Sequence, residues 1–181
     1  DPRGDFLDNC IGTFNVLEAA RTSARDPIVI FASTNKVYGA LDDLAIIEEV
    51  DHYRLADLPN GVDESHRIDP TSPYACSKSA AENYVLDYAR TYGVRTVAFR
   101  QSCIYGEHQW GVEDQGWLAW FLIAAKAGRP ITIFGDGKQV RDLLHVDDLF
   151  DCFTSAVERI DRAAGQVYNV GGGKANSVSI W

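Results

Sequence analysis

The feature that most constrains the fold of this chain is the alternation of short apolar runs with helical patterns. Two runs rich in β-branched residues, 27–33 (PIVIFAS) and 94–100 (VRTVAFR), flank a helical pattern over 73–92. Ser72 is a suitable N-cap for that helix, and Pro73 suits its first position, where a missing N–H costs nothing. Because strands that alternate with helices pair as a parallel sheet with crossover helices, the sequence predicts an α/β fold.

Further elements follow the same pattern along the chain. The sequence predicts helices over 7–25, about 114–127 and 147–159, strands over 131–134 and 166–170, the start of a helix over 177–181, and a polar, irregular segment over 40–71. The first expected helix has no strand before it, and the last one is cut short. We therefore expect the chain to be a fragment of a larger α/β protein.

The composition argues against several classes of function. The 181 residues suit one domain or part of a larger one, and a hydrophobic fraction of 46% is enough to fill a core. The net charge of −9 argues against nucleic-acid binding, which needs a basic surface. No apolar run approaches the roughly 20 residues of a membrane span, and no signal-peptide pattern opens the sequence. We expect no nucleic-acid partner and no membrane partner.

The cysteines indicate the compartment. Cys10, Cys76, Cys103 and Cys152 are scattered and include no C-x-x-C pair. Scattered cysteines are typical of free thiols under reducing conditions, so we expect a cytoplasmic protein. We expect no metal site.

Tyr74 and Lys78 lie four residues apart in the helix expected over 73–92, and hence on one helix face. A free tyrosine has a pKa near 10, and lowering it to about 7 takes roughly 4 kcal/mol of phenolate stabilisation. An ammonium group one turn away supplies part of that energy, and the positive charge of an oxidised nicotinamide ring supplies more. The pair therefore suits removal of a proton from a sugar hydroxyl while hydride leaves the same carbon.

A Tyr-x-x-x-Lys spacing also arises by chance in many helices, so its surroundings decide between the two interpretations. Ser33 and Thr34 offer hydroxyl groups at the end of the strand expected over 27–33, and open α/β sheets bind ligands at the carboxyl ends of their strands. Pro73 directly precedes the tyrosine. These neighbours favour a catalytic pair over a chance one.

Four segments together resemble the extended short-chain dehydrogenase/reductase family of NAD-dependent nucleotide-sugar epimerases and dehydratases. They are 8–20 (DNCIGTFNVLEAA), 31–39 (FASTNKVYG), 72–78 (SPYACSK) and 137–149 (GKQVRDLLHVDDL). The resemblance covers nearly the whole chain. It implies a Rossmann-like, doubly wound parallel sheet, NAD as the cofactor and a nucleotide-diphosphate sugar as the substrate.

The resemblance also implies roles for individual residues. Thr34, Tyr74 and Lys78 would form the catalytic set. Tyr74 would be the base, Lys78 would hold the nicotinamide ribose and favour the phenolate, and Thr34 would hydrogen-bond the reacting hydroxyl. Cofactor contacts are implied for Tyr74 and Lys78, and in addition for Asn9, Ser33 and Gln101.

Substrate contacts are implied for residues in the second half of the chain. Arg141 matches the arginine that binds the substrate's diphosphate in the family. The loop after residue 100 lies where the family lines the sugar pocket, and the implied contacts there are Ser102, Cys103, His108, Gln109 and Gln115. Members of the family commonly pair through two helices of each subunit, so a homodimer is expected through the helices over 7–25 and 73–92.

Two further segments, 58–65 (LPNGVDES) and 114–121 (DQGWLAWF), most resemble family members that invert C2 of a nucleotide-linked sugar. Such an epimerase oxidises the sugar carbon with bound NAD and returns hydride to the opposite face. A 4-epimerase of a UDP-sugar and a non-catalytic NAD-binding member of the family are the alternatives. Asn35 and Lys36 stand where the 4,6-dehydratases of the family carry an acidic pair, which argues against dehydration.

The glycine-rich dinucleotide loop of the family, G-x-x-G-x-x-G, is not in this sequence, and 169–176 (NVGGGKAN) lies too late in the chain to replace it. We therefore expect the first βαβ units and the C-terminal end of the substrate domain to lie outside this chain, together with the residues that select NAD over NADP. Residues 1–100 would be the C-terminal portion of the NAD-binding domain, and residues 101–181 would hold substrate-binding loops and late Rossmann strands. The isolated fragment is expected to be inactive.

Overall fold

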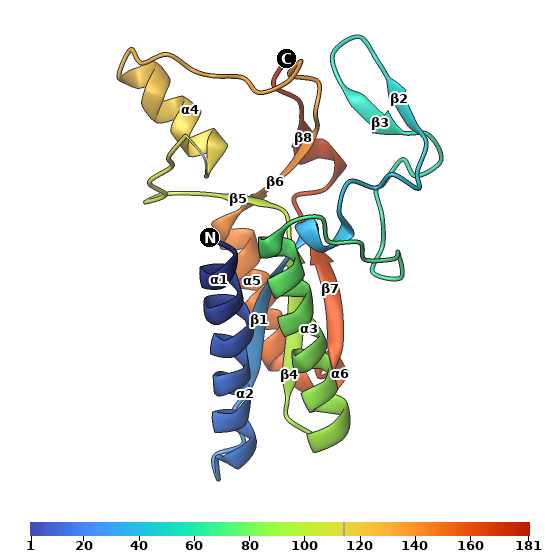
Figure 1. The fold of residues 1–181 in the computed structure, drawn as a ribbon, viewed down its shortest axis with the longest axis vertical. Coiled ribbons are helices and arrows are strands. Elements are labelled where there is room, and N and C mark those ends of the chain that lie inside the picture. The colour runs from blue at the N-terminus through green and yellow to red at the C-terminus, as the bar shows by residue number, and fades with distance from the viewer. Residues whose placement is uncertain (114) are drawn as a thin grey trace. The chain divides into compact units, whose positions relative to one another are not determined.

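A computed structural model describes residues 1–113 and 115–181. Asp114, at the start of the helix expected over about 114–127, lies outside the described residues. The chain forms two compact units, and the elements of both are labelled in Figure 1. The first unit takes residues 1–42, 63–101 and 151–170, and the second unit takes residues 43–62, 102–150 and 171–181.

The first unit is built on a parallel sheet with the strand order β1 (Val29–Thr34), β4 (Thr96–Gln101) and β7 (Gln166–Val170). The central strand, β4, is buried along its whole length, as expected for a strand of a parallel sheet. The register pairs Ser33 with Arg100 and Thr34 with Gln101, so β1 and β4 end side by side. These pairings confirm the α/β fold class and the parallel sheet.

One face of this sheet is covered by helices that pack against each other (Figure 1). α3 (Pro73–Tyr92) has the bounds predicted from the sequence. The N-terminal helix runs through α1 (Pro2–Asp5), the π-helical η1 (Phe6–Ile11) and α2 (Gly12–Thr22), so it begins before the expected residue 7. The core between these helices and the sheet includes Leu17, Phe31, Ala81, Val85, Tyr88 and Ala98.

The opposite face of the sheet is covered by α5 (Val146–Glu158), of which the part from Asp151 onward belongs to the first unit. The ring of Phe153 lies against that of Phe99, with centroids 5.2 Å apart. Because strand side chains alternate between faces, Phe99 points away from the core that holds its neighbour Ala98. α6 (Ile160–Ala163) then leads into β7.

The second unit contains a small mixed sheet and a hairpin. β5 (Cys103–Tyr105) pairs in parallel with β6 (Arg141–His145), which pairs antiparallel with β8 (Ser177–Val178). The hairpin is formed by β2 (Ile46–Glu48) and β3 (Tyr53–Leu55). The unit also contains α4 (Trp117–Lys126) and a 3-10 turn, η3 (Lys174–Asn176).

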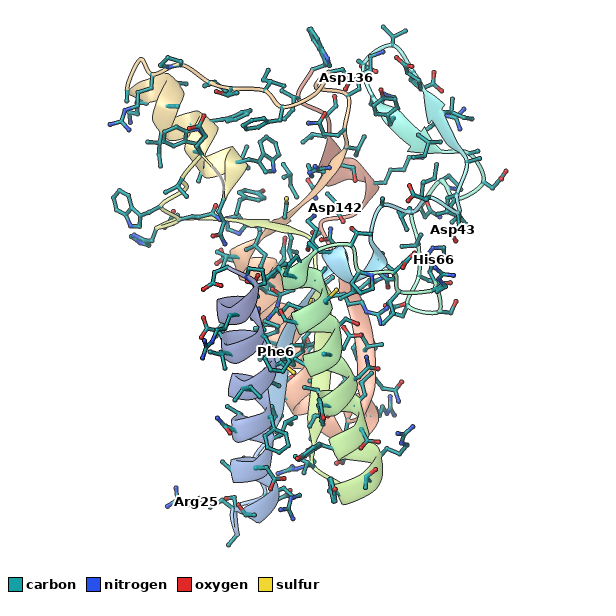
Figure 2. All side chains as sticks on the ribbon, viewed as in Figure 1. Phe6, Arg25, Asp43, His66, Asp136 and Asp142 are labelled. Atoms are coloured by element: carbon teal, nitrogen blue, oxygen red, sulfur yellow. The ribbon has the colours of Figure 1, made fainter. Side chains whose placement is uncertain are left out.

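The hairpin is attached to the turn at residues 136–138. Tyr53 Oη donates to Asp136 Oδ2 at 2.5 Å, and Lys138 Nζ donates to Glu48 Oε1 at 2.6 Å. Asp136 is labelled in Figure 2. This hairpin lies within the segment expected to be irregular, because two strands of three residues each leave little apolar pattern in a polar sequence.

Two expectations about the second unit are wrong. Residues 131–134 are not a strand, and Ile133 and Phe134 are exposed. No strand in the described part of the chain pairs with them, and an apolar run needs such hydrogen bonds to become a strand. Residues 177–181 do not begin a helix, because Ser177 and Val178 pair with β6; the Ser-Val-Ser-Ile alternation has the period of a strand.

The division expected after residue 100 lies one residue from the junction between Gln101 and Ser102. Each unit also takes segments from other parts of the chain, because the hairpin segment interrupts the first unit and 151–170 returns to it. The roles of 1–100 in cofactor binding and of 101–181 in substrate binding stay predictions.

Candidate active site

The first turn of α3 holds the tyrosine of the predicted pair. Ser72 has an extended backbone, and its Oγ accepts a hydrogen bond from the backbone N–H of Ala75 at 3.1 Å. Pro73 occupies the first helical position, so Tyr74 lies at the very start of the helix. Tyr74 is 40% exposed, which leaves its phenol accessible to a substrate. Lys78 follows one helical turn later on the same face.

The Lys78 side chain is partly buried against β1. Its Nζ lies 4.7 Å from the centroid of the Phe31 ring, a cation–π contact that stabilises the ammonium form. Burial lowers the pKa of Lys78 below the ordinary lysine value, because desolvation disfavours the charged form. Phe31 precedes Thr34 by three residues on β1. The structure therefore places the lysine of the pair against the strand that ends in the predicted threonine.

The chain turns sharply after Thr34 into a single 3-10 turn, η2 (Asn35–Tyr38), which Thr34 caps by accepting the backbone N–H of Lys36 at 3.3 Å. Gly39 follows with a φ of +68°, and a Cβ at this position would lie 2.1 Å from the carbonyl oxygen of Asp69. Only glycine fits both conditions. The backbone N–H of Asp69 also donates to a carbonyl of η2 at 2.8 Å. The segment that leads into α3 is thus fixed against the turn that follows β1.

Asn9 connects the N-terminal helix to the first turn of α3. It lies in η1, and π-helical turns are frequent at functional sites. Its Nδ2 donates to Ser77 Oγ at 3.0 Å, and Ser77 Oγ donates to the carbonyl oxygen of Tyr74 at 2.8 Å. The structure therefore brings Asn9 next to the Tyr–Lys pair, while its contact with a cofactor stays a prediction.

Ser33 and Gln101, the other residues predicted to contact the cofactor, lie at the carboxyl ends of β1 and β4. The Ser33 hydroxyl is buried and donates to Glu82 Oε2 at 2.5 Å, so only its oxygen lone pairs are left for another group. Gln101 is 9% exposed, and its buried Nε2 has no hydrogen-bond partner among the described residues. Buried amides without a partner are rare because they lose free energy of hydration. Gln101 therefore offers a donor for a bound group beside Thr34, its register partner.

The residues predicted to contact substrate all belong to the second unit. Three of them gather at β5. Cys103 Sγ accepts a hydrogen bond from Trp117 Nε1 at 3.4 Å. Ser102 Oγ and Gln109 Oε1 are buried and have no hydrogen-bond partner in the described part of the chain. This group of polar atoms could bind a ligand, and its contact with substrate stays a prediction.

The remaining three differ in their surroundings. His108 and Gln115 are exposed. Arg141 begins β6, is partly buried, and its Nη1 donates to the carbonyl oxygen of Val140 at 3.1 Å. β5 and β6 are paired, so Arg141 lies on the strand next to Cys103. Diphosphate binding by Arg141 stays a prediction.

The glycines at 171–173 pack against β6. A Cβ on Gly171 would lie 1.8 Å from Asp142 Oδ2, and a Cβ on Gly172 would lie 1.8 Å from the carbonyl oxygen of Leu143. Burial raises the pKa of Asp142 and outweighs the hydrogen bonds that it accepts from the backbone of two of these glycines (Figure 2 labels Asp142). The glycines thus allow close packing at a strand, which agrees with the expectation that they are not the dinucleotide loop.

The sequence analysis missed a buried ion pair between Glu82 of α3 and Arg100 of β4. Arg100 Nη2 lies 2.7 Å from Glu82 Oε1, and the side chains are 6% and 2% exposed respectively. The sequence does indicate such a pair, because Arg100 ends the apolar run 94–100 and a buried arginine needs a buried partner. Glu82 lies eight residues after Tyr74, and therefore on the same helix face.

Comparison with known proteins adds to this geometry. Residues 1–171 match the family model described as the NAD-dependent epimerase/dehydratase family. Among curated relatives, CDP-paratose 2-epimerase from Salmonella typhi is 44% identical over 185 residues, which cover 99% of this chain and 55% of the relative. The chain thus spans little more than half the length of that relative.

Solved structures resemble the chain over nearly all of its length. The X-ray structure of Pal from Bacillus thuringiensis superposes with a TM-score of 0.80 at 35% identity, over 99% of this chain and 51% of that one. UDP-glucuronic acid 4-epimerase from Bacillus cereus, solved in complex with UDP-glucuronic acid and NAD, gives a TM-score of 0.74 at 27% identity. The match covers 97% of this chain and 48% of that one.

Proposed function

The chain belongs to the NAD-dependent epimerase/dehydratase family, and on that premise we propose that the intact protein is a nucleotide-sugar epimerase that inverts C2 of a CDP-linked sugar of the CDP-paratose type. The observation that carries this proposal is the start of α3. There an accessible Tyr74 precedes Lys78 by one turn, and Lys78 packs on the strand that ends in Thr34. The identity to CDP-paratose 2-epimerase supports the choice of carbon and of nucleotide.

The proposed chemistry assigns one role to each member of this set. The Tyr74 phenolate takes the proton of the sugar hydroxyl, a C=O bond forms at that carbon, and the hydrogen on the carbon leaves as hydride. The Lys78 ammonium stabilises the phenolate by Coulomb attraction, and the Thr34 hydroxyl hydrogen-bonds the reacting oxygen. The ketone then rotates to present its opposite face, hydride returns to the carbon, and Tyr74 returns the proton to the oxygen. No net oxidation results.

The residues at the ends of β1 and β4 fit the nicotinamide end of a dinucleotide. Gln101 Nε2 is a buried donor without a partner among the described residues, which suits the carbonyl or hydroxyl oxygens of such a group. Lys78 would hold ribose hydroxyls, and Asn9 and Ser33 would complete the contacts. When bound, NAD supplies the two-electron acceptor that takes the hydride and gives it back.

Inversion at C4 of a UDP-sugar is the second candidate, and the structural likeness to UDP-glucuronic acid 4-epimerase favours it. The same catalytic residues serve both reactions, because only the carbon presented to them differs. Dehydration is disfavoured because Asn35 and Lys36, which directly follow Thr34, cannot act as an acidic pair. A non-catalytic role is disfavoured by the presence of Thr34, Tyr74 and Lys78 together.

We assign substrate binding to the second unit. Arg141 suits a diphosphate because a guanidinium binds phosphate oxygens through paired hydrogen bonds. Ser102, Cys103 and Gln109 provide polar atoms around β5, two of them buried and without a partner in the described chain. His108 and Gln115 are exposed and available to the sugar or the nucleotide.

We further propose a cytoplasmic homodimer. Cys10, Cys76 and Cys103 are free thiols in the structure, as suits a reducing compartment. Large apolar side chains are exposed on the helices that family resemblance assigns to a dimer interface, namely Phe6, Leu7, Phe14, Val16, Tyr84 and Tyr92. Pairing of these helices with a second copy would remove that surface from water. None of the described helices is both long and apolar enough to cross a membrane.

Product analysis by NMR tests the proposed activity. Full-length protein incubated with CDP-paratose is expected to yield a product inverted at C2, whereas UDP-glucose incubated in parallel is expected to remain unchanged at C4. The reason is that the segments 58–65 and 114–121 resemble 2-epimerases more than 4-epimerases. Inversion of UDP-glucose at C4 with no reaction of CDP-paratose would replace the first candidate with the second.

A further inference from the structure

The Glu82–Arg100 pair is unusual because two charges are almost completely withdrawn from water. Arg100 Nη2 and Nε lie 2.7 Å and 3.1 Å from Glu82 Oε1, so the guanidinium binds the carboxylate through two nitrogens. Removing an ion pair from water costs several kcal/mol per ion. Apolar residues of the same volume would often hold a helix on a sheet equally well. The retention of this pair therefore calls for a role other than stability.

The pair attaches α3 to both strands that end at the active site. Glu82 Oε2 accepts the Ser33 hydroxyl at 2.5 Å, while Oε1 binds Arg100, and Ser33 and Arg100 are register partners on β1 and β4. One carboxylate thus reaches two adjacent strands one residue before their ends. Thr34 follows Ser33, and Gln101 follows Arg100.

Glu82 also lies in line with the catalytic pair. Tyr74, Lys78 and Glu82 are spaced by four residues each, so they form one row along α3, in which Lys78 and Glu82 contact β1. Rotation of α3 about its axis, or a slide along it, would break the contacts of Glu82 and would move Tyr74 and Lys78 by a similar distance. Fixing Glu82 therefore fixes the position of the catalytic residues relative to Thr34.

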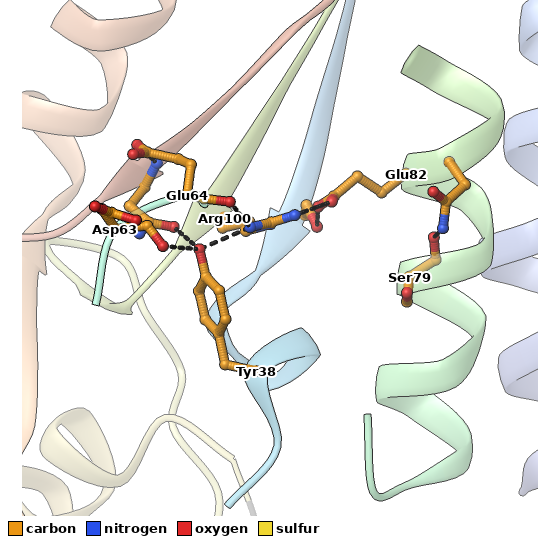
Figure 3. A network of polar contacts seen from close by, with 9 residues as sticks. Tyr38, Asp63, Glu64, Ser79, Glu82 and Arg100 are labelled. Carbon is orange, nitrogen blue, oxygen red and sulfur yellow. Dashed lines mark hydrogen bonds and ion pairs between the residues drawn. The ribbon is translucent and has the colours of Figure 1, made fainter. Parts of the chain in front are cut away.

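Arg100 also makes hydrogen bonds on the side of its guanidinium that points away from Glu82 (Figure 3). Its Nη1 donates to Tyr38 Oη at 2.7 Å and to the carbonyl oxygen of Glu64 at 3.3 Å. Tyr38 Oη lies 2.8 Å from Asn169 Oδ1, to which it donates. The hydrogen bonds to Glu82 and Tyr38 outweigh the effect of burial and raise the pKa of Arg100. Tyr38 belongs to η2, so the network also reaches the turn that follows Thr34.

We propose that Glu82 and Arg100 are positioning residues, which hold α3 in the rotation and depth at which Tyr74 and Lys78 meet Thr34 and the bound substrate. This inference rests on the proposed epimerase function. Neither residue touches the reacting atoms in this assignment. Their contribution is to geometry, and a misplacement of about 1 Å can cost a factor of roughly 100 in rate.

The test replaces both partners in the full-length enzyme, by Glu82→Leu with Arg100→Leu. No buried charge is left unpaired in this double variant, so its melting temperature is expected to fall only slightly, chiefly because the buried Ser33 hydroxyl loses its acceptor. We expect kcat to fall by roughly 100-fold while KM changes little, because substrate binding by the second unit is not altered. If the pair served stability alone, a stable double variant would keep the wild-type kcat. A double variant that is stable and fully active would therefore overturn the inference.

Two further variants keep the outcome decisive. Glu82→Asp keeps the charge but shortens the side chain by one methylene, so it is expected to fold and to lose about tenfold in kcat; wild-type turnover in a folded Glu82→Asp enzyme would also overturn the inference. The control is Asp87→Asn with Arg90→Gln, which removes an exposed ion pair on the same helix and should leave kcat unchanged. If the wild type shows no epimerase activity, the proposed function fails; if the wild type is active and the pair is dispensable, only the positioning role fails.

Discussion

Replacement of Tyr74 with Phe in the full-length protein is expected to lower kcat by about 1,000-fold. The substitution removes only the phenolic oxygen, which in this account takes the proton of the sugar hydroxyl, and positioned acid–base groups contribute roughly 100- to 10,000-fold. Among the described residues the Tyr74 hydroxyl has no hydrogen-bond partner, and Tyr74 is 40% exposed, so stability should change little. The measurements are turnover of the nucleotide sugar, cofactor content and melting temperature.

The matched control for this experiment is Tyr84→Phe. Tyr84 lies on the same helix, is 46% exposed, and its ring contacts the edge of Phe14. Loss of its hydroxyl should leave kcat at the wild-type value. Normal turnover by Tyr74→Phe would contradict the assignment of the base, and equal losses in both variants would indicate a general effect on the helix.

Replacement of Lys78 with Met is expected to lower kcat by about 100-fold and to move the acidic limb of the pH–rate profile to higher pH. Methionine retains a flexible apolar stem against Phe31 but removes the positive charge one turn from Tyr74. Without that charge the phenolate is less stable, so a higher pH is needed to form it. The experiment is a pH–rate profile of kcat for the two enzymes, and an unchanged acidic limb would contradict the role of the ammonium.

The alkaline limb of the same pH–rate profile tests the role of the Lys78 ammonium independently. Burial lowers the pKa of Lys78, so the ammonium is lost at a lower pH than in an exposed lysine, and wild-type activity should decline correspondingly early as pH rises. Lys78→Arg keeps its charge throughout this range and should shift that decline to higher pH, whatever its absolute rate. Lys126→Met, at the exposed end of α4, is the control and should leave both limbs unchanged.

The elements that could be predicted from the sequence are those specified by residues within or next to the element itself. α3 has the expected bounds because the Ser72 side chain caps its first turn, Pro73 suits the first helical position, and Gly93 adopts the left-handed conformation that ends the helix. β1 and β4 were predicted because strands buried on both faces are continuous apolar runs. β6 and β8 were missed because they depend on partners far away in the sequence and contain charged or hydroxyl side chains.

The same distinction holds for the site. Tyr74, Lys78 and Thr34 could be identified from spacing and from resemblance, and the structure places all three in the first unit. Glu82 and Arg100 could not be paired from the sequence, since only the register of β1 with β4 and the packing of α3 bring them together. Likewise, Gln101 Nε2 can be recognised as a buried donor without a partner among the described residues only when burial is known.

The central claim is that one sugar carbon is oxidised and reduced again in place, with Tyr74 handling the proton. The most direct measurement follows the hydrogen on that carbon, using CDP-paratose labelled with deuterium at C2 and the full-length enzyme in ordinary water. The account predicts a product inverted at C2 that retains the deuterium at C2, because the hydrogen leaves and returns as hydride without exchange with solvent. Inversion at C2 with protium from water in place of the label would contradict it, since the carbon would then have been deprotonated rather than oxidised.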